Sequence, residues 1–432
     1  MNTGTGILMR DYLSTKGEVG TGQRMKVLLI AYACEPNRGS EPGTGWNMAL
    51  GLAARHEITV ATRANNRAAV EAALADMPDS KRPKFLYLDP PAWTLRLKAR
   101  KIMPTQMFYF FWQKAVAKHL RHSGGRFDIL HQLTFNSFEV PPFAFAATPG
   151  FKIWGPVGGG QTAPNGLLRA FSPIDRLKEI WRCCRVTFSS MTPWVREALG
   201  IADMVLFANR ETSRLLGKHY KGKCEMMIDV GVDTEKFHSS SSRSHQDKGV
   251  TFLAAGRLEA RKGFSLLIDA FALLAPEYPD ARLRIVGGGP ERRRLERQIT
   301  ARGLADAVML TGAVGHDDMR HEFESADVFV FPSLRDTSGA VVLEAMAMGL
   351  PVICIDHQGA AIMVSDDCGL KIRPGCYANT LDSLRDALAR LADDPEERQQ
   401  LGENARVRAM EAFSWEEKFA RMLGIYDEAV GR

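Results

Sequence analysis

Short apolar runs alternate with amphipathic segments along most of the chain, and glycine-containing turns separate them. This alternation is typical of βαβ units, in which helices cover a parallel sheet. In the first half, the apolar runs predict strands at Lys26–Ala33, Glu57–Thr62, Phe85–Leu88, Asp128–Leu133, Lys152–Gly155 and Met204–Ala208. In the second half, they predict strands at Val250–Gly256, Leu283–Gly287, Val308–Thr311, Asp327–Pro332 and Pro351–Ile355. The pattern therefore predicts an α/β protein with two doubly wound domains.

The domain boundaries follow from interruptions of this pattern. Helical periodicity is clear at Phe264–Leu274, Glu291–Arg302 and Trp415–Val430. The segment Ser239–Lys248 is polar and has the composition of a linker. We expect a disordered leader, two Rossmann-like domains joined by a linker, and a C-terminal helix that could cross back to the first domain. The expected bounds are 1–24 for the leader, 25–235 for the first domain, 236–248 for the linker, 249–412 for the second domain and 413–432 for the helix.

Positive charge is concentrated in one stretch. The formal net charge is only +6, but residues 90–127 contain no acidic residue and eight Lys or Arg residues. The same stretch holds Trp93 and the aromatic run Phe108–Trp112. Cations mixed with aromatic side chains suit a surface that docks on anionic lipid, and a core helix with a basic polar side fits the composition equally well. No nucleic-acid recognition motif accompanies the stretch, so a nucleic-acid partner is disfavoured.

The seven cysteines are scattered, without CxxC pairs and without histidines at metal-ligand spacing. This distribution predicts a reduced compartment and no metal site. No apolar run approaches the length of a bilayer span, and the first residues lack the features of a signal peptide. We therefore expect a cytoplasmic protein, which would lie at the inner face of the membrane if the basic stretch binds lipid.

The strongest chemical signal directly follows the predicted strand Asp327–Pro332. The segment reads as a tight turn and a helix that begins near Gly339. A helix start offers backbone amides to a phosphate. Asp336 and Glu344 flank this start and can face one ligand, so their carboxylates would accept hydrogen bonds from sugar hydroxyls. The amides at the helix start belong to Ser338, Gly339 and Ala340.

A second signal lies in the loop Gly256–Gly263, between the first strand and the first helix of the second domain. Arg257 and Lys262 project from this loop at the carboxyl edge of the sheet, where α/β proteins bind ligands. Two cations there would neutralise the charge that grows on a departing pyrophosphate, without a metal ion. Alone, the loop would be an ordinary basic surface loop. Next to the acidic segment, the functional interpretation is favoured, with Arg261 as the weaker candidate.

These two segments resemble the E-x7-E motif and the G-R-x-x-x-x-K-G loop of the retaining glycosyltransferase family four. The chain departs from the usual motif because its first acid is Asp336 and the aromatic position holds Ser338. The resemblance implies the GT-B fold, two Rossmann-like domains facing a central cleft. It also implies catalytic roles for Arg257, Lys262 and Asp336, with Glu344 on the ribose of the donor.

Further residues are assigned with the help of the same resemblance. In the donor site these are Gly287 at a glycine-rich strand end, Val314 beside the base, and Gly43 with Gly45 near the diphosphate. Glu41 is expected to contact the acceptor, with a solvated loop acid as the alternative. His131 corresponds to a histidine that the family places near the reacting sugar, with a structural histidine as the alternative.

The sequence thus predicts a retaining, metal-independent glycosyltransferase that needs no cofactor. Its donor would be a nucleotide-diphosphate sugar, and its acceptor a lipid-linked or polysaccharide precursor glycan. A nucleotide-sugar epimerase or hydrolase on the same scaffold would turn over the donor without an acceptor. A catalytically silent sugar-nucleotide binding protein would bind the donor without turnover.

Overall fold

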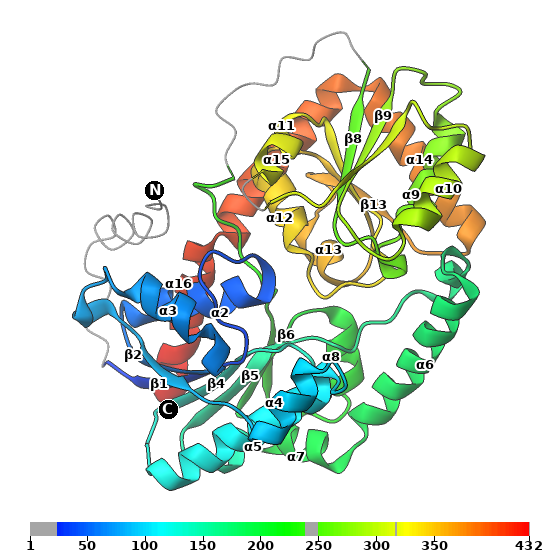
Figure 1. Cartoon of the computed structure of the whole chain (residues 1–432). Helices are drawn as coiled ribbons and strands as arrows, with labels where there is room; N and C mark the ends of the chain where they lie inside the picture. Colours follow the sequence, from blue (N-terminus) through cyan, green and yellow to red (C-terminus); the bar gives the residue numbers. More distant parts are fainter. Residues whose placement is uncertain (1–23, 238–248, 316–317, 432) are drawn as a thin grey trace. The chain divides into compact units, whose positions relative to one another are not determined.

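A computed structural model describes residues 24–237, 249–315 and 318–431 (Figure 1). The predicted leader, apart from Arg24, and residues 238–248 of the predicted linker lie outside the described residues. The described chain divides into two compact units. Among the described residues, unit 1 comprises 24–160, 186–230 and 415–431, and unit 2 comprises 161–185, 231–237, 249–315 and 318–414.

Unit 1 is built on a parallel sheet with the strand order β3-β2-β1-β4-β5-β6-β7. Its strands are β1 (Lys26–Ala31), β2 (Glu57–Thr62), β3 (Lys84–Tyr87), β4 (Ile129–Thr134), β5 (Phe151–Val157), β6 (Met204–Phe207) and β7 (Lys223–Met226). Its helices are α2 (Ser40–Ala53), α3 (Arg67–Leu74), α4 (Ala92–Ala99), α5 (Thr105–Ser123), α7 (Pro193–Ile201), α8 (Arg210–Leu216) and α16 (Trp415–Val430). Helix α6 (Pro173–Ser190) begins in unit 2 and ends in unit 1.

Helices cover both faces of this sheet. Val27 and Leu29 of β1 join the apolar cluster that includes side chains of α2 and α16. Leu28 and Ile30 join the cluster that includes side chains of α5. Successive side chains of a strand point to opposite faces, so a strand covered on both faces must be apolar throughout. This explains the continuous apolar run that marks β1 in the sequence.

The C-terminal helix α16 belongs to unit 1, as predicted. Its side chains Phe419, Met422 and Tyr426 are buried in the cluster shared with α2. A Cβ atom at Gly51 of α2 would lie 2.6 Å from the Phe419 ring. Glycine at this position therefore allows the two helices to touch.

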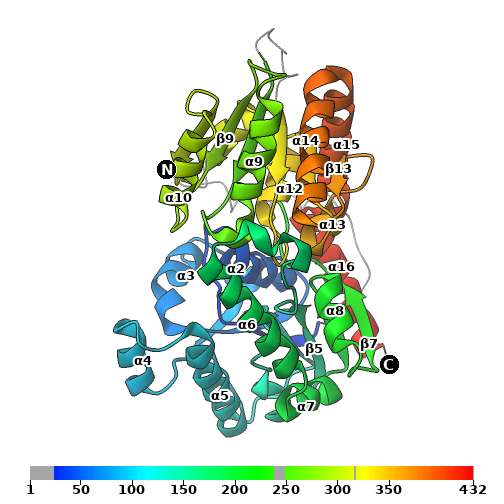
Figure 2. The ribbon, with the colours of Figure 1, turned by 90° about the vertical axis from the view of Figure 1, so that its right-hand side faces the viewer.

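Unit 2 is built on a parallel sheet with the strand order β10-β9-β8-β11-β12-β13. Its strands are β8 (Thr251–Ala255), β9 (Arg282–Val286), β10 (Val308–Gly312), β11 (Val328–Phe331), β12 (Val352–Ile355) and β13 (Gly369–Ile372). Its helices are α9 (Phe264–Leu274), α10 (Arg292–Ala301), α11 (Met319–Glu324), α12 (Ala340–Ala347), α13 (Gln358–Met363), α14 (Tyr377–Asp393) and α15 (Pro395–Phe413). Helices α9 and α14 pack against each other (Figure 2).

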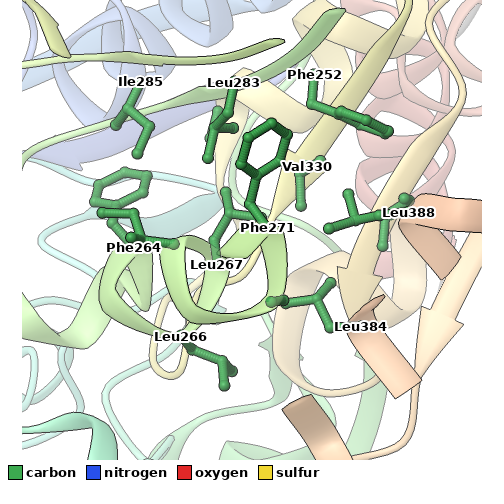
Figure 3. Packing of buried hydrophobic residues seen from close by; sticks show 14 of the residues in the cluster. Phe252, Phe264, Leu266, Leu267, Phe271, Leu283, Ile285, Val330, Leu384 and Leu388 are labelled. Carbon is green, nitrogen blue, oxygen red and sulfur yellow. The ribbon is translucent and has the colours of Figure 1, made fainter. Parts of the chain in front are cut away.

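Figure 3 shows part of the core beneath α9 and α14. Leu267 and Phe271 of α9 point toward Leu283 and Ile285 of β9, and Leu388 of α14 completes this layer. All five side chains are fully buried. Burial of each contributes about 1.5–3 kcal/mol relative to exposure, so this layer fixes the sheet from which the site loops extend.

The two sheets share one topology. In each sheet the chain moves outward from the first strand in one direction, then returns and continues in the other direction. The reversal falls between β1 and β4 in unit 1 and between β8 and β11 in unit 2. Ligands of such sheets bind beyond the carboxyl ends of the strands at this switch point. The loops after these four strands are therefore the first places to look for function.

The structure differs from the sequence prediction in two edge strands, in one segment of the predicted first domain and in small shifts of strand ends. Two strands, β7 and β13, were not predicted, because each is a short edge strand that includes a lysine. The segment Gln161–Arg185, which the predicted bounds place in the first domain, packs with unit 2. The remaining predicted strands are present with ends shifted by at most two residues, and α9 and α16 have the predicted bounds.

Candidate active site

The loop after β8 reaches the end of β11 because of one glycine. Residues Ala260–Lys262 form a short 3-10 turn, and Gly263 then caps α9 with a φ of 71°. A Cβ atom at Gly263 would lie 2.0 Å from the carbonyl oxygen of Pro332, directly after β11. Only glycine combines this close approach with a positive φ. The turn thereby brings Lys262 to the loop that follows β11.

A network of charges links these two loops. Lys262 Nζ forms a short ion pair with the Asp336 carboxylate, and Arg261 Nη1 lies 3.7 Å from the same carboxylate. Glu259 joins the cations of its own loop, 2.7 Å from Arg261 Nε and 2.9 Å from Arg257 Nε. The Lys262 side chain is 12% exposed, whereas Arg257 is 73% exposed. Three predicted residues, Arg257, Lys262 and Asp336, therefore belong to one network across the switch point.

The Asp336 carboxyl stays charged despite its surroundings. Burial acts to raise its pKa, but the Lys262 ammonium and then the Arg261 guanidinium outweigh burial and hold the pKa below its ordinary value. The backbone also fixes this residue, because the Asp336 amide donates a 2.5 Å hydrogen bond to the side-chain oxygen of Gln358. Gln358 follows β12 and was not predicted from the sequence. Its only local signal is a polar residue just beyond a buried strand.

Helix α12 begins at Ala340, after the loop that follows β11. Gly339 is its N-cap, with a φ of 83°, and a Cβ atom there would lie 2.7 Å from the Phe331 ring. Ser338 is buried, and Ala340 is the first helical residue. The first amides of an α-helix have no acceptor within the helix, so this start is suited to an anion. The predicted helix start near Gly339 is confirmed.

Glu344 occupies the second turn of α12 in a different electrostatic environment from Asp336. Burial raises the pKa of Glu344 to about 7, and the Lys236 ammonium acts in the opposite direction. The charge network therefore contains three of the four residues expected to converge, while Glu344 lies in the second turn of α12.

The other predicted donor residues of unit 2 lie at strand ends. Gly287 has a φ of 146°, and a Cβ atom there would lie 1.9 Å from the carbonyl oxygen of Gly256. The ends of β8 and β9 therefore approach each other through two glycines. Val314 is partly buried in the loop after β10, just before residues 316–317, which lie outside the described residues.

A buried ion pair supports the Asp336 loop from the segment that joins unit 2 unexpectedly. Glu179 of α6 contacts Arg335 Nε at 2.9 Å, and it also accepts a 3.1 Å hydrogen bond from the Ala163 amide. Glu179 is 5% exposed. Residues 179 and 335 are 156 positions apart, so no local pattern in the sequence could predict their contact.

In unit 1, the loops at the switch point meet through a carboxylate and an amide. Glu41 lies in the first turn of α2, and its carboxylate accepts a 2.8 Å hydrogen bond from the Asn136 amide, which follows β4. The Asn136 side chain donates to the Asp229 carboxylate. Burial raises the pKa of Glu41 to about 7, the Asn136 hydrogen bond opposes this shift, and the Asp229 charge adds to it. Glu41 is therefore not a solvated loop acid.

Gly43 and Gly45 lie within helix α2 and not in the loop predicted from the sequence. Both are buried. A Cβ atom would lie 2.1 Å from the Arg38 carbonyl oxygen at Gly43 and 2.2 Å from the Ala33 carbonyl oxygen at Gly45. These glycines let the chain after β1 fold tightly onto the first turns of α2, which positions Glu41.

His131 has a structural environment. It lies in the middle of β4, and its ring is fully buried. Its Nδ1 is 2.7 Å from the Tyr426 hydroxyl, and its Nε2 is 2.7 Å from the Gly155 carbonyl oxygen. A carbonyl only accepts, so Nε2 donates and Nδ1 accepts from the hydroxyl. Burial lowers the pKa of His131 to about 4. With both nitrogens engaged, this neutral ring is unsuited to acid–base catalysis, which corrects the sequence prediction.

The basic stretch 90–127 folds into α4 and α5, and most of its aromatic side chains face the interior. Phe108, Tyr109 and Trp112 are fully or almost fully buried. Trp93 and Met107 remain exposed. The predicted lipid-binding surface is therefore reduced to a few side chains, because α5 uses its aromatic residues as core.

Within the part of the chain that the structure describes, no helix is long and apolar enough to cross a membrane. Within the same residues, no group of three His, Cys, Asp or Glu side chains is arranged to hold a metal ion.

Comparisons with known proteins agree with this geometry. Residues 235–408 match the family described as glycosyl transferases group 1. An α-D-kanosaminyltransferase from Streptomyces kanamyceticus is 34% identical over 41% of this chain and 45% of that protein. A GDP-mannose-dependent α-(1-6)-phosphatidylinositol monomannoside mannosyltransferase from Mycolicibacterium smegmatis is 30% identical over 61% of this chain and 74% of that protein. The chain spans about half the length of several curated relatives that it matches.

A solved structure supports the fold independently. The sucrose-phosphate synthase of Thermosynechococcus elongatus matches 94% of this chain and 100% of its own chain, with a TM-score of 0.67 and 19% identity. The fold is therefore GT-B. The charge network and the start of α12 both lie within the matched family region. Fold, motifs and sequence similarity together show that the chain belongs to the group 1 glycosyl transferases.

Proposed function

We propose that this chain is a retaining glycosyltransferase that moves a sugar from a nucleotide-diphosphate donor to a glycan or lipid-linked acceptor. The observation that carries the proposal is the Lys262–Asp336 contact across the switch point of unit 2. A diphosphate at the start of α12 would lie next to Lys262, with the sugar hydroxyls beside Asp336. Glu344 would accept a hydrogen bond from the ribose.

The proposed chemistry needs electrostatic stabilisation and no carboxylate nucleophile. The bond between the anomeric carbon and the diphosphate oxygen breaks, and the acceptor oxygen forms the new bond on the same face of the sugar. The departing oxygen takes the acceptor proton. Lys262 is largely buried, so its charge would act strongly on the growing negative charge of the diphosphate. Arg257 is exposed and would add its charge from the rim.

We propose that unit 1 binds the acceptor, with Glu41 as a contact and with Gly43 and Gly45 shaping the chain beside it. The charge state of Glu41 changes near neutral pH, so this side chain can donate or accept a hydrogen bond to a hydroxyl. The M. smegmatis relative is named as a phosphatidylinositol monomannoside mannosyltransferase, which supports a lipid-linked substrate. We place the enzyme in the cytoplasm at the inner membrane face. The exposed Trp93 and Met107 are the proposed lipid contacts of the 90–127 stretch.

The test is a donor and acceptor panel. Purified protein is incubated with UDP- and GDP-linked sugars, with and without crude lipid-linked oligosaccharide, and the released nucleotide diphosphate is measured together with the glycosylated product. We expect release that depends on the acceptor. Donor turnover without acceptor would favour a hydrolase or an epimerase, and donor binding without turnover would favour a silent binding protein.

A further inference from the structure

Helix α6 carries an exposed apolar stripe that the site does not use. Four of its side chains are largely exposed, namely Ile174 at 70%, Leu177 at 69%, Trp181 at 64% and Phe188 at 70%. Cys184 is exposed in the same row. At about 100° per residue, these five positions fall within an arc of roughly 80° on one face of the helix. Large apolar side chains aligned over the whole length of a helix indicate a surface that binds something.

A row of cations borders this stripe. At about 100° per residue, Lys178, Arg182 and Arg185 lie within roughly 80° of Ile174, on the side of the helix next to the stripe. The Arg185 guanidinium lies over the Trp181 ring, 5.3 Å from its centroid. The Lys178 side chain is 70% exposed. The stripe and its border therefore combine exposed apolar side chains with positive charge.

The acidic residues of α6 offset this row only in part. Asp175 accepts contacts from Lys178 at 2.8 Å and from the Ser172 hydroxyl at 2.6 Å. Glu179 is buried and contacts Arg335. The helix holds four basic and two acidic residues, so its net charge is +2. An anionic partner is the electrostatic complement of this surface.

The apolar surface continues past the end of α6. Met191 and Trp194 are exposed there. Ser189 and Trp194 line a groove of about 240 Å³ in unit 1, whose walls include Phe110 and Phe143. Met191 therefore extends the exposed apolar surface beyond α6, and Trp194 contributes to the groove itself.

We propose that α6 lies in the surface of an anionic lipid bilayer, with its apolar stripe inserted and its cations against the phosphates. A helix with an apolar face, a cationic flank and tryptophan near the boundary is the composition of an interfacial helix. The inference does not depend on the proposed transferase activity, because lipid binding is measured without any sugar. It also differs from the 90–127 stretch, whose aromatic side chains are mostly buried.

The experiment is co-sedimentation of the full chain with vesicles of phosphatidylcholine alone and of equal parts phosphatidylcholine and phosphatidylglycerol. We expect binding to the anionic vesicles that weakens with salt. The variant Leu177→Glu with Trp181→Glu should reduce the bound fraction about tenfold or more, because charged side chains do not insert. The variant Lys178→Gln with Arg185→Gln should weaken binding by about fivefold for each cation removed.

Matched variants keep this test decisive. Leu273→Glu with Met309→Glu places the same charges on other exposed apolar positions and should bind vesicles as the wild type does. Circular dichroism confirms folding of each variant, since the altered α6 side chains are exposed. Unchanged vesicle binding by the Leu177/Trp181 variant overturns the proposal. The proposal is also overturned if the wild type does not bind vesicles and sedimentation velocity without lipid shows a dimer that the Leu177/Trp181 variant does not form.

Discussion

The two switch points of this protein share a topology and differ in their electrostatics. In unit 2, the loops after β8 and β11 meet through a cation and an anion, Lys262 and Asp336. In unit 1, the loops after β1 and β4 meet through the Glu41 carboxylate and the backbone amide of Asn136. The same fold has therefore placed a cation and an anion at one position and a partly buried acid, hydrogen-bonded to a backbone amide, at the equivalent one.

The neighbours of each acid, more than its burial, decide its charge. Asp336 and Glu41 both lose water, which acts to raise the pKa of each. At Asp336 two cations reverse that effect. At Glu41 the Asp229 carboxylate adds to it, and the pKa reaches about 7. A donor diphosphate requires constant positive charge around it, whereas a neutral acceptor hydroxyl can use an acid that gains or loses its proton.

The largest expected effect comes from removing the cation of unit 2. Lys262→Ala should lower turnover by about a hundredfold to a thousandfold, as removal of one preorganised charge-stabilising group does in other enzymes. The measurement is nucleotide diphosphate release at saturating donor and acceptor. Because we propose that the charges of unit 2 stabilise the departing diphosphate, Glu41→Gln should cost far less turnover.

Arg320→Ala is the matched control for this change. Arg320 is a cation of unit 2 whose guanidinium contacts a single local acid, Glu324, at 2.8 Å. Its removal should leave turnover unchanged, and circular dichroism should show that both variants are folded. Near-normal turnover in the Lys262 variant would show that the charge pair has no role in the reaction. The electrostatic difference between the two switch points would then have no functional meaning.

The next effect concerns donor affinity. At about pH 9, above the Glu344 pKa of about 7, Glu344→Gln replaces a charged acceptor by a neutral one at the proposed ribose position. Hydrogen bonds to charged groups contribute about 1–1.5 kcal/mol more than hydrogen bonds to neutral groups, so the KM for the donor should rise roughly tenfold with a smaller change in kcat. Steady-state kinetics over a range of donor concentrations separate the two parameters.

Glu296→Gln serves as its control, since Glu296 is an exposed acid of α10 that pairs with Arg292. That variant should keep the wild-type KM. A donor KM unchanged by Glu344→Gln would show that this side chain does not reach the ribose, and unit 2 would then recognise its donor through the network and the helix start alone.

Sequence patterns predicted several elements of both units well because the determining features are local. The bounds of α9 and α16 follow from helical periodicity, and the start of α12 follows from a glycine after a buried strand. The Lys262–Asp336 pair joins two such local signals at one sheet edge. Where residues lie next to the strands of a switch point, the topology alone brings them together.

Other contacts had no local signal. His131 and Tyr426 are 295 positions apart, and nothing in the sequence near either residue indicates that the two side chains form a hydrogen bond. The burial of the aromatic run in α5 was equally hard to predict. Consecutive aromatic residues point to all sides of a helix, and composition does not distinguish the buried ones from the exposed ones. Which face of a helix is buried depends on the elements that pack against it. The apolar side chains of α6 are therefore more exposed than the aromatic side chains of α5, although both helices are rich in apolar residues.

Glu41 offers a test through stability. Its pKa rises from an ordinary 4.5 to about 7 on folding, so the folded state holds the proton more tightly than the unfolded state. Its contribution is therefore favourable below pH 4.5 and is lost as the pH rises to about 7. Glu41→Gln keeps an oxygen for the Asn136 amide and removes the charge. Above pH 7 it should be more stable than the wild type, on the order of 1–3 kcal/mol, with a much smaller difference at pH 4.5.

Urea unfolding at a series of pH values measures this difference. Glu428→Gln is a suitable control, because Glu428 is an exposed acid of unit 1 that contacts Lys223. A difference between wild type and Glu41→Gln that stays constant over the whole range would mean that Glu41 titrates normally. The electrostatic contrast between the two switch points would then disappear.

The smallest effect concerns His131, which the sequence predicted to be catalytic and which the structure places in a structural environment. Tyr426→Phe removes the hydroxyl that donates to His131 Nδ1 while the Nε2 contact with Gly155 remains. We expect a loss of about 1 kcal/mol in the free energy of unfolding and unchanged kcat per folded molecule. Tyr220→Phe, which removes a hydroxyl that donates to the Lys223 carbonyl at 3.0 Å, should behave in the same way. If Tyr426→Phe lowered kcat without a loss of stability, and Tyr220→Phe did not, His131 would have a role in the reaction. Unit 1 would then contribute to the chemistry that we propose for unit 2.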